Sequence, residues 1–264
     1  MVVQIRKFTV NRIHIAFQAF EVERISDPII RIRADKAYIF IYKDEKTEKF
    51  MKQYYKIEKQ LQDHGIQVVR NGIDLLDYFE VIQSISKIIK EERDNNPATE
   101  ILINLSVGTN ITAIAAMDAC RFWGCTPYYV VGEKYIAQNE ITKETMSLSS
   151  GKMEIFSPPV FKMIKPKPNL IEALKIIAEK KTGIYKKDFR RKLLAKNLLV
   201  IQKKYDDPRD PKKLSAEYMA MNQQYIYPLR DLWNFIEVSD AKRNQKITLT
   251  ELGEETVKIF KYLS

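Results

Sequence analysis

One short turn carries residue types that suit a bound phosphate. The run NLSVGTNIT occupies residues 104–112, between an apolar, β-branched strand pattern and a helical pattern. Gly108 permits a positive φ or a close backbone approach. Thr109 or Asn110 can cap the helix, whose first free N–H groups suit an anionic oxygen, and Ser106 adds a hydroxyl group. The turn is therefore predicted to hold a phosphate. It matches neither the Walker A pattern nor GxGxxG, and an ordinary strand–helix turn is the alternative.

A second strand end could supply contacts to a base. In IHIAFQAFEVERI, residues 13–25, a strand pattern runs directly into a helical one through Phe17, Gln18, Ala19 and Phe20. Ligands of open α/β sheets lie at the carboxyl ends of the strands, and this tip lies beside the 106–110 turn if the first and fourth strands are neighbours. Aromatic rings and an amide suit stacking and hydrogen bonding to a base. The same residues could equally fill the core.

Enzymatic and metal sites receive little support from the residue types present. His14 lies inside a strand pattern and His64 at a helix end, and neither has a nucleophile or carboxylate partner in sequence. Asp74 and Asp77 share a helical face, where complementing the helix dipole is the simpler role. The two cysteines, at positions 120 and 125, lack a metal-ligand pattern and suit packed thiols. We predict no catalytic residue, no metal site and no resident cofactor.

The elements that must position these turns alternate between strand and helix. Strand patterns cover residues 13–17, 37–42, 66–70, 100–106 and 126–131. Helical patterns cover residues 20–32, 45–65, 74–94 and 110–124. This alternation indicates a Rossmann-like parallel sheet with right-handed crossovers. A β-rich extension at 133–157, with a turn at SSG, completes a predicted domain over residues 1–157.

The rest of the chain has another organisation. Residues 157–169, SPPVFKMIKPKPN, hold four prolines, so residues 158–168 are predicted to be a semi-rigid linker. Helical patterns, two strands around a charged turn, and a final helix follow over residues 169–264; the helices are expected at 169–181, 186–197, 214–233 and 251–263. That order is the order of a winged helix-turn-helix domain.

Charge divides between the two halves. The net charge is +10, and residues 158–264 contain 23 Lys+Arg against 13 Asp+Glu, so the whole excess lies there. A basic surface confined to one domain suggests a polyanion partner, although a solvated lysine-rich surface is the alternative. The composition, with 45% hydrophobic and 30% charged residues, suits a soluble protein. No secretory signal or membrane span is visible in the sequence, so we expect a cytoplasmic location.

These pieces together resemble a known family. The segments IHIAFQAFEVERISDPIIRIRADKAYIF, NLSVGTNITAIAAMDAC and TPYYVVGEKY, with YPLRDLWNFIEV and the LTELG after the wing, are similar to the CARF (CRISPR-associated Rossmann fold) winged-helix transcriptional regulators, mostly archaeal. The resemblance implies a homodimer that binds cyclic oligoadenylate, commonly the tetramer, across its interface. It departs at the first strand tip, where Phe17 and Ala19 stand in place of a proline and a glycine, and at Asn110, where many CARF domains carry a lysine.

Helical geometry gives the predicted DNA contacts. On the helix expected from Leu214, residues Leu214, Tyr218, Met221, Tyr225 and Leu229 share one face and should be buried. The opposite face would read bases, with Gln223 or Asn222 on adenine and Met219 and Ala220 on a thymine methyl group. The base-facing residues are predicted to be Ser215, Met219, Asn222 and Gln223. The phosphate contacts are predicted to be Arg190, Arg191, Lys212, Lys213, Lys242 and Arg243.

The sequence thus predicts a homodimeric regulator that binds double-stranded DNA and responds to a cyclic oligoadenylate effector. The effector contacts are predicted to be Phe17, Gln18, Ala19, Phe20, Ser106, Val107, Gly108, Thr109 and Asn110. Two alternatives stay open: a ring nuclease that degrades cyclic oligoadenylate in the same pocket, and a winged helix that binds protein instead of DNA.

Overall fold

The computed structural model of the protein divides into two compact units. It describes residues 11–43, 48–135, 149–161, 163–201, 210–241 and 243–263. Unit 1 covers Met1–Met163 and unit 2 covers Ile164–Ser264, so the boundary lies within the predicted linker. None of the described helices is long and apolar enough to cross a membrane.

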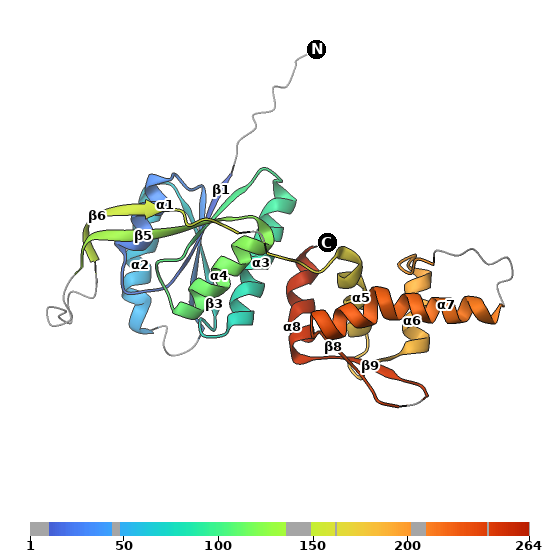
Figure 1. Ribbon diagram of the computed structural model, residues 1–264. Coiled ribbons are helices and arrows are strands. Elements are labelled where there is room, and N and C mark those ends of the chain that lie inside the picture. Colours follow the sequence, from blue (N-terminus) through green and yellow to red (C-terminus); the bar gives the residue numbers. More distant parts are fainter. Residues whose placement is uncertain are drawn as a thin grey trace, which may run out of the picture. The chain divides into compact units, whose positions relative to one another are not determined.

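Unit 1 is a six-stranded sheet in the order β3-β2-β1-β4-β5-β6 (Figure 1). The first five strands in this order are parallel and β6 is antiparallel to β5. The strands are β1 (Arg12–Phe17), β2 (Lys36–Tyr42), β3 (Gln67–Ile73), β4 (Glu100–Asn104), β5 (Thr126–Tyr135) and β6 (Ser149–Phe156). The predicted Rossmann-like fold is confirmed. Strands β1 and β4 pair, which meets the condition for the β1 tip to lie beside the 106–110 turn.

Four helices connect these strands: α1 (Glu23–Arg31), α2 (Glu48–Asp63), α3 (Tyr78–Asn95) and α4 (Asn110–Trp123). Helices α1 and α2 pack on each other, as do α3 and α4. The chain moves outward from β1 to β3 and then returns to β4, so right-handed crossovers place the two helix pairs on opposite faces of the sheet. The expected turn at SSG was wrong: these residues begin β6.

Unit 2 has the element order of a winged helix domain. Helix α5 (Pro168–Ala178) is followed by β7 (Ile184–Tyr185), α6 (Lys186–Ala195) and α7 (Pro211–Met221). Two π-helical segments, η3 (Asn222–Ile226) and η4 (Pro228–Leu232), continue α7, and then come β8 (Ile236–Val238), β9 (Lys246–Leu249), α8 (Glu251–Phe260) and the 3-10 turn η5 (Lys261–Leu263). The three short strands form a sheet in the order β7-β9-β8.

The long helix of unit 2 starts earlier than the hydrophobic pattern predicted. Asp210 caps it by accepting a hydrogen bond from the N–H of Lys212 at 2.8 Å, and Pro211 occupies the first helical position. A proline loses nothing there because that N–H has no partner within the helix. Lys212 and Lys213 therefore lie in the first turn of the helix and not before it.

Candidate functional site: a notched sheet edge and a candidate nucleic-acid interface

The two central strands of unit 1 end before their outer neighbours do. Strands β1 and β4 are paired up to Ile15 and Ile103, and the chain reverses its direction of sheet growth between them. Such a switch point is where open α/β sheets bind ligands. Beyond it, β2 runs on to Tyr42 and β5 to Tyr135. The carboxyl edge of the sheet is therefore notched at its centre.

Side chains take over the ladder hydrogen bonds on both sides of this notch. On one side, the Tyr42 N–H donates to Oε1 of Gln18 at 3.3 Å. On the other, the Val130 N–H donates to Oγ of Ser106 at 2.5 Å. An unpaired backbone group at a buried edge is costly, so both side chains stabilise the sheet by accepting these hydrogen bonds. The predicted ligand contacts Gln18 and Ser106 thus also hold the edges of the notch.

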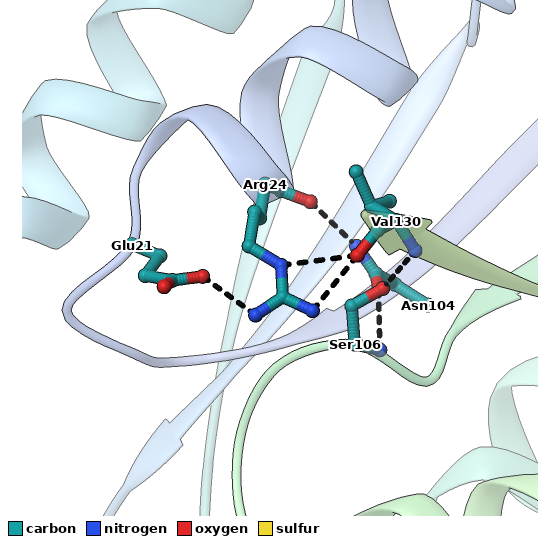
Figure 2. Close-up of polar contacts among 5 residues, drawn as sticks. All are labelled: Glu21, Arg24, Asn104, Ser106 and Val130. Carbon is teal, nitrogen blue, oxygen red and sulfur yellow. Dashed lines mark hydrogen bonds and ion pairs between the residues drawn. The ribbon is translucent and has the colours of Figure 1, made fainter. Parts of the chain in front are cut away.

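A closed circuit of hydrogen bonds joins α1, the turn after β4, and β5 (Figure 2). Arg24 donates from Nη2 and Nε to the Val130 carbonyl at 2.8 and 3.2 Å, and from Nη1 to Glu21 Oε2 at 2.8 Å. The amide of Asn104 donates to the Arg24 carbonyl at 2.9 Å and accepts from the Ser106 N–H at 2.8 Å. With the Val130–Ser106 bond, the circuit is complete. Glu21, Arg24 and Asn104 were not predicted as site residues. Their signals in the sequence are a charged pair at a helix start and a polar residue that ends a strand.

Gly108 is required where it stands. Its φ is +91°, and a Cβ atom added to it would lie 2.5 Å from Oγ1 of Thr112 and 2.7 Å from Cβ of Phe17. Both expected roles of this glycine, the positive φ and the close approach, are present. The close approach is to the protein itself, because the turn rests on the buried tip of β1.

The turn and the start of α4 leave two pairs of N–H groups without acceptors among the described residues. Thr109 caps the helix through a capping box with Thr112, with Thr109 N–H to Thr112 Oγ1 at 2.8 Å and Thr112 N–H to Thr109 Oγ1 at 3.1 Å. Thr109 also donates its hydroxyl to the Leu75 carbonyl at 3.0 Å. Within the described part of the chain, no hydrogen bond is made by the N–H groups of Val107, Gly108, Asn110 and Ile111. Four free donors at a helix N-terminus can hold an anionic oxygen.

The predicted base contacts at the β1 tip divide into buried and exposed residues. Phe17 is wholly buried and stacks on Phe40, with ring centroids 5.6 Å apart, so it belongs to the core and cannot meet a base. Gln18 is buried as well. Ala19 is half-buried, and Phe20 is 37% exposed, with its ring 4.4 Å from that of Phe50. Of the two predicted aromatic contacts, only Phe20 is accessible.

Several other polar residues have structural roles. His14 is fully buried, with Nδ1 3.1 Å from the Tyr128 hydroxyl, and burial together with the charge of Arg12 lowers the pKa of His14 to about 3. Asp77 caps α3 by accepting from two N–H groups of its first turn. In the described ranges, no three His, Cys, Asp or Glu side chains gather as a possible metal site.

The predicted base-reading helix of unit 2 has one buried face and one exposed face. Met221, Tyr225 and Leu229 are fully buried, as predicted, and Met219 is 60% exposed. The prediction for Leu214 was wrong: it is 46% exposed, because it lies in the first turn, before the packed part of the helix.

The predicted phosphate contacts differ in their availability. Arg190 is unavailable: its half-buried side chain forms an ion pair with buried Glu217, and its guanidinium lies 5.3 Å from the centre of the Tyr218 ring. Arg191 is exposed and lies 3.6 Å from Asp188. Lys212 and Arg243 are exposed and Lys213 is half-buried, whereas Lys242 lies outside the described residues. Of the predicted base-facing residues, Ser215 and Gln223 are exposed and Asn222 is half-buried.

Two family models match the chain, one in each unit. The model described as HFX_2341_N:-like, N-terminal, matches residues 12–135. The model described as the DUF6293 C-terminal winged helix domain matches residues 169–261. The first match covers β1 to β5 and the second covers the winged helix, so each candidate site lies inside a matched domain.

One curated relative and three solved structures are similar to parts or most of the chain. A stretch of 130 residues is 30% identical to the uncharacterized protein MJ1513 of Methanocaldococcus jannaschii, and it spans 46% of this chain but only 38% of that protein. Can2 from Sulfobacillus thermosulfidooxidans, in complex with cyclic tetra-adenylate, is 13% identical over 96% of this chain and 65% of that one, with a TM-score of 0.38. Enterococcus italicus Csm6, bound to cyclic hexa-2'-fluoro-hexa-dAMP, is 12% identical over 97% and 77%, with a TM-score of 0.44. Protein VC1899 from Vibrio cholerae is 10% identical over 96% and 65%, with a TM-score of 0.37. Proteins this distant often differ in function.

Proposed function

Because the chain joins an HFX_2341_N:-like domain to a DUF6293-type winged helix domain, we propose that it is a DNA-binding transcription regulator whose N-terminal unit senses a cyclic oligoadenylate. The observation that carries the sensing role is the set of four free N–H groups at the switch point of the sheet. The family resemblance of the sequence supplies the ligand class. The cyclic tetramer is the common ligand of that family.

The phosphate of the ligand is held by the backbone in this proposal. The N–H groups of Val107, Gly108, Asn110 and Ile111 point from one turn and the first residues of α4, whose dipole adds partial positive charge. Asn110 replaces the lysine that many CARF domains carry, so the cradle lacks that cation. Binding should therefore depend on geometry more than on ionic strength.

The base has one accessible aromatic neighbour. Phe20 lies on Phe50, which is itself 5.6 Å from the ring of Tyr42. Phe20 follows the end of β1, Tyr42 ends β2 and Phe50 lies in α2. An adenine stacked on Phe20 would keep its phosphate within reach of the turn.

A second copy of the chain completes the ligand site in this proposal. The exposed start of α4 presents Ile111 at 36% and Ile114 at 55% exposure, one helical turn apart and next to the free N–H groups. Apolar side chains beside a polar cradle suit an isologous contact. A cyclic tetranucleotide has twofold symmetry, so two turns facing across the axis would each hold one half of the ring. Light scattering should show a dimer at micromolar concentration, and a monomer with and without ligand would contradict the pairing.

The winged helix unit binds DNA in this proposal. Its basic charge, the exposed helix face and the exposed Arg243 in the wing suit the phosphates and the major groove. A winged helix that binds protein instead would show no binding to DNA at low salt. A wild-type chain that binds no DNA at 50 mM salt, with and without ligand, would therefore remove this half of the proposal.

One substitution tests the phosphate cradle with little disturbance to the fold. Asn110 is the first residue of α4, where proline is favoured, and Thr109 before it has φ −101° and ψ 165°, which a following proline accepts. Asn110→Pro therefore deletes one free N–H. Asn110→Ala is the matched control, since it removes the same side chain and keeps the N–H.

The measurement is calorimetric titration with cyclic tetra-adenylate. A hydrogen bond to a charged group contributes about 1.5–3 kcal/mol, so Asn110→Pro should bind about 10- to 150-fold more weakly than Asn110→Ala. Equal affinities of the two variants would show that this N–H does not hold the ligand. Recovery of the ligand after titration distinguishes the remaining alternative, because a ring nuclease would return it cleaved.

A further inference from the structure

The long helix of unit 2 repeats its exposure every four residues. Glu217, Met221, Tyr225 and Leu229 are all buried, and the residues two places before each of them, Ser215, Met219, Gln223 and Tyr227, are all exposed. An α-helix has 3.6 residues per turn, so a strict four-residue repeat would drift by about 40° per step and leave its face within three steps. A regular α-helix does not explain this pattern.

The two π-helical segments account for the straight repeat. A π turn closes its hydrogen bond over five residues and is wider than an α turn, so each residue turns through a smaller angle. The segments η3 and η4 therefore offset the drift that a four-residue repeat accumulates in an α-helix. Tyr227 donates its N–H to the Asn222 carbonyl and Trp233 donates to the Pro228 carbonyl at 3.1 Å, each over five residues. Pro228 favours this geometry because it has no N–H, and its ring would clash with the carbonyl four residues earlier in an α-helix. Ser215, Met219, Gln223 and Tyr227 therefore form one straight exposed row, the reading row.

The reading row carries no charge. Residues 214–229 contain a single charged residue, Glu217, and its carboxylate is buried in the ion pair with Arg190. Cations stand only at the two ends. Lys212 is exposed one turn before Ser215. Arg230 comes three residues after Tyr227, with its guanidinium 5.6 Å from the centre of that ring, and forms a bidentate pair with Asp231.

A second cation reinforces the far end of the row. Lys186, the first residue of α6, lies near Arg230, and burial followed by the charge of Arg230 lowers the pKa of its ammonium group. Its Nζ donates to Oε1 of Gln245 at the base of the wing, 2.7 Å away. Contacts to phosphates position a protein on DNA, and contacts to base edges specify sequence. The arrangement therefore has positioning groups at both ends and neutral groups between them.

We propose that the reading row selects A·T base pairs in the major groove. This inference rests on the DNA binding proposed above. The amide of Gln223 matches the N6 and N7 groups of adenine, and the Met219 and Tyr227 side chains offer apolar contact to thymine methyl groups. Guanine is most often read by arginine or lysine, and the row has neither.

The test selects binding sites from randomised double-stranded DNA with the full chain and its variants. The wild type should enrich A·T pairs at the centre of its site. Gln223→Ala should lose about 5- to 150-fold of discrimination at one base pair, and Gln223→Arg should change the preference there from adenine to guanine. Gln224→Ala is the matched control, because that amide bonds the backbone of Val200 at 2.6 and 3.3 Å and not the exposed face.

A modified site tests the methyl contacts without changing the protein. Replacing each central thymine of the selected site by deoxyuridine removes only the methyl group, and affinity should fall about fourfold for each methyl that is buried. A G·C-rich centre, an unchanged site with Gln223→Arg, or equal affinity for the deoxyuridine site would overturn the inference. A wild-type chain that binds no DNA would instead overturn the proposed function.

Discussion

Substitutions in the buried pair of Arg24 and Glu21 should show whether an unpaired buried charge or a lost contact lowers the stability of unit 1. Their side chains are 10% and 6% exposed, and the guanidinium also supplies both donors to the Val130 carbonyl. Arg24→Met leaves the Glu21 carboxylate buried without its partner, which costs about 3–5 kcal/mol. The orphaned carbonyl adds about 1–3 kcal/mol. The sum, about 4–8 kcal/mol, rivals the whole stability of a typical domain.

Adding Glu21→Leu should restore part of that stability. The second change removes the unpaired charge and leaves only the cost at Val130, so the double variant should be more stable than Arg24→Met by about 3–5 kcal/mol. The two changes touch the same contact, so the non-additive part of a double-mutant cycle measures their coupling.

Urea unfolding followed by tryptophan fluorescence can measure this in unit 1 alone. The chain has two tryptophans, Trp123 in α4 and Trp233 after η4, so a Trp233→Phe background leaves a single reporter in unit 1. A double variant no more stable than Arg24→Met would refute the reasoning, because the cost would then not arise from an unpaired buried charge.

Three further outcomes follow from the described contacts. His14 stays neutral when folded, since its pKa is lowered to about 3 from 6.5, so the unfolded state binds the extra proton below pH 6.5. Unit 1 should therefore lose about 2 kcal/mol of stability between pH 7 and pH 5, and His14→Gln should lack this slope in the same urea assay. Gly108→Ala should cost about 2–5 kcal/mol, from positive-φ strain and overpacking against Phe17; a loss below 1 kcal/mol would show that the turn relaxes. Arg243→Ala should weaken DNA binding on every sequence and reduce the salt slope by about one, whereas Arg190→Ala should lower stability instead, and the reverse result would exchange their roles.

Periodicity predicted the fold because the spacing of apolar residues within each element shows its type and the face that it buries. Alternating strand and helix patterns predicted the parallel sheet, and the order of elements after the prolines predicted the winged helix; both are confirmed. The adjacency of β1 and β4 was left as a condition by the sequence, and the structure meets it by pairing the two strands, which brings the two predicted turns together. The family models match an HFX_2341_N:-like domain and a winged helix domain in the predicted order, while ligand, dimer and DNA stay proposals.

The site was less predictable because it depends on which strand ends first. Phe17 and Phe20 have the same side chain three residues apart, but β1 ends at Phe17 and buries it against Phe40, and Phe20 falls on the exposed loop. Arg190 looked like a free cation because its partner Glu217 lies far along the chain. The π turns were also invisible to a pattern that assumes 100° per residue, although Pro228 is a local signal for them.

The alternation of bonded and free N–H groups after β4 has a consequence for amide hydrogen exchange. The N–H groups of Ser106, Thr109 and Thr112 are each held by a side chain of the same turn. Those at 107, 108, 110 and 111 are not, among the described residues. In the free protein, exchange should thus be slow at residues 106, 109 and 112 and fast at the two pairs between them. An anion bound in the turn should slow exchange only at those two pairs. The protection pattern would then map the anion one amide at a time, with no label on the ligand.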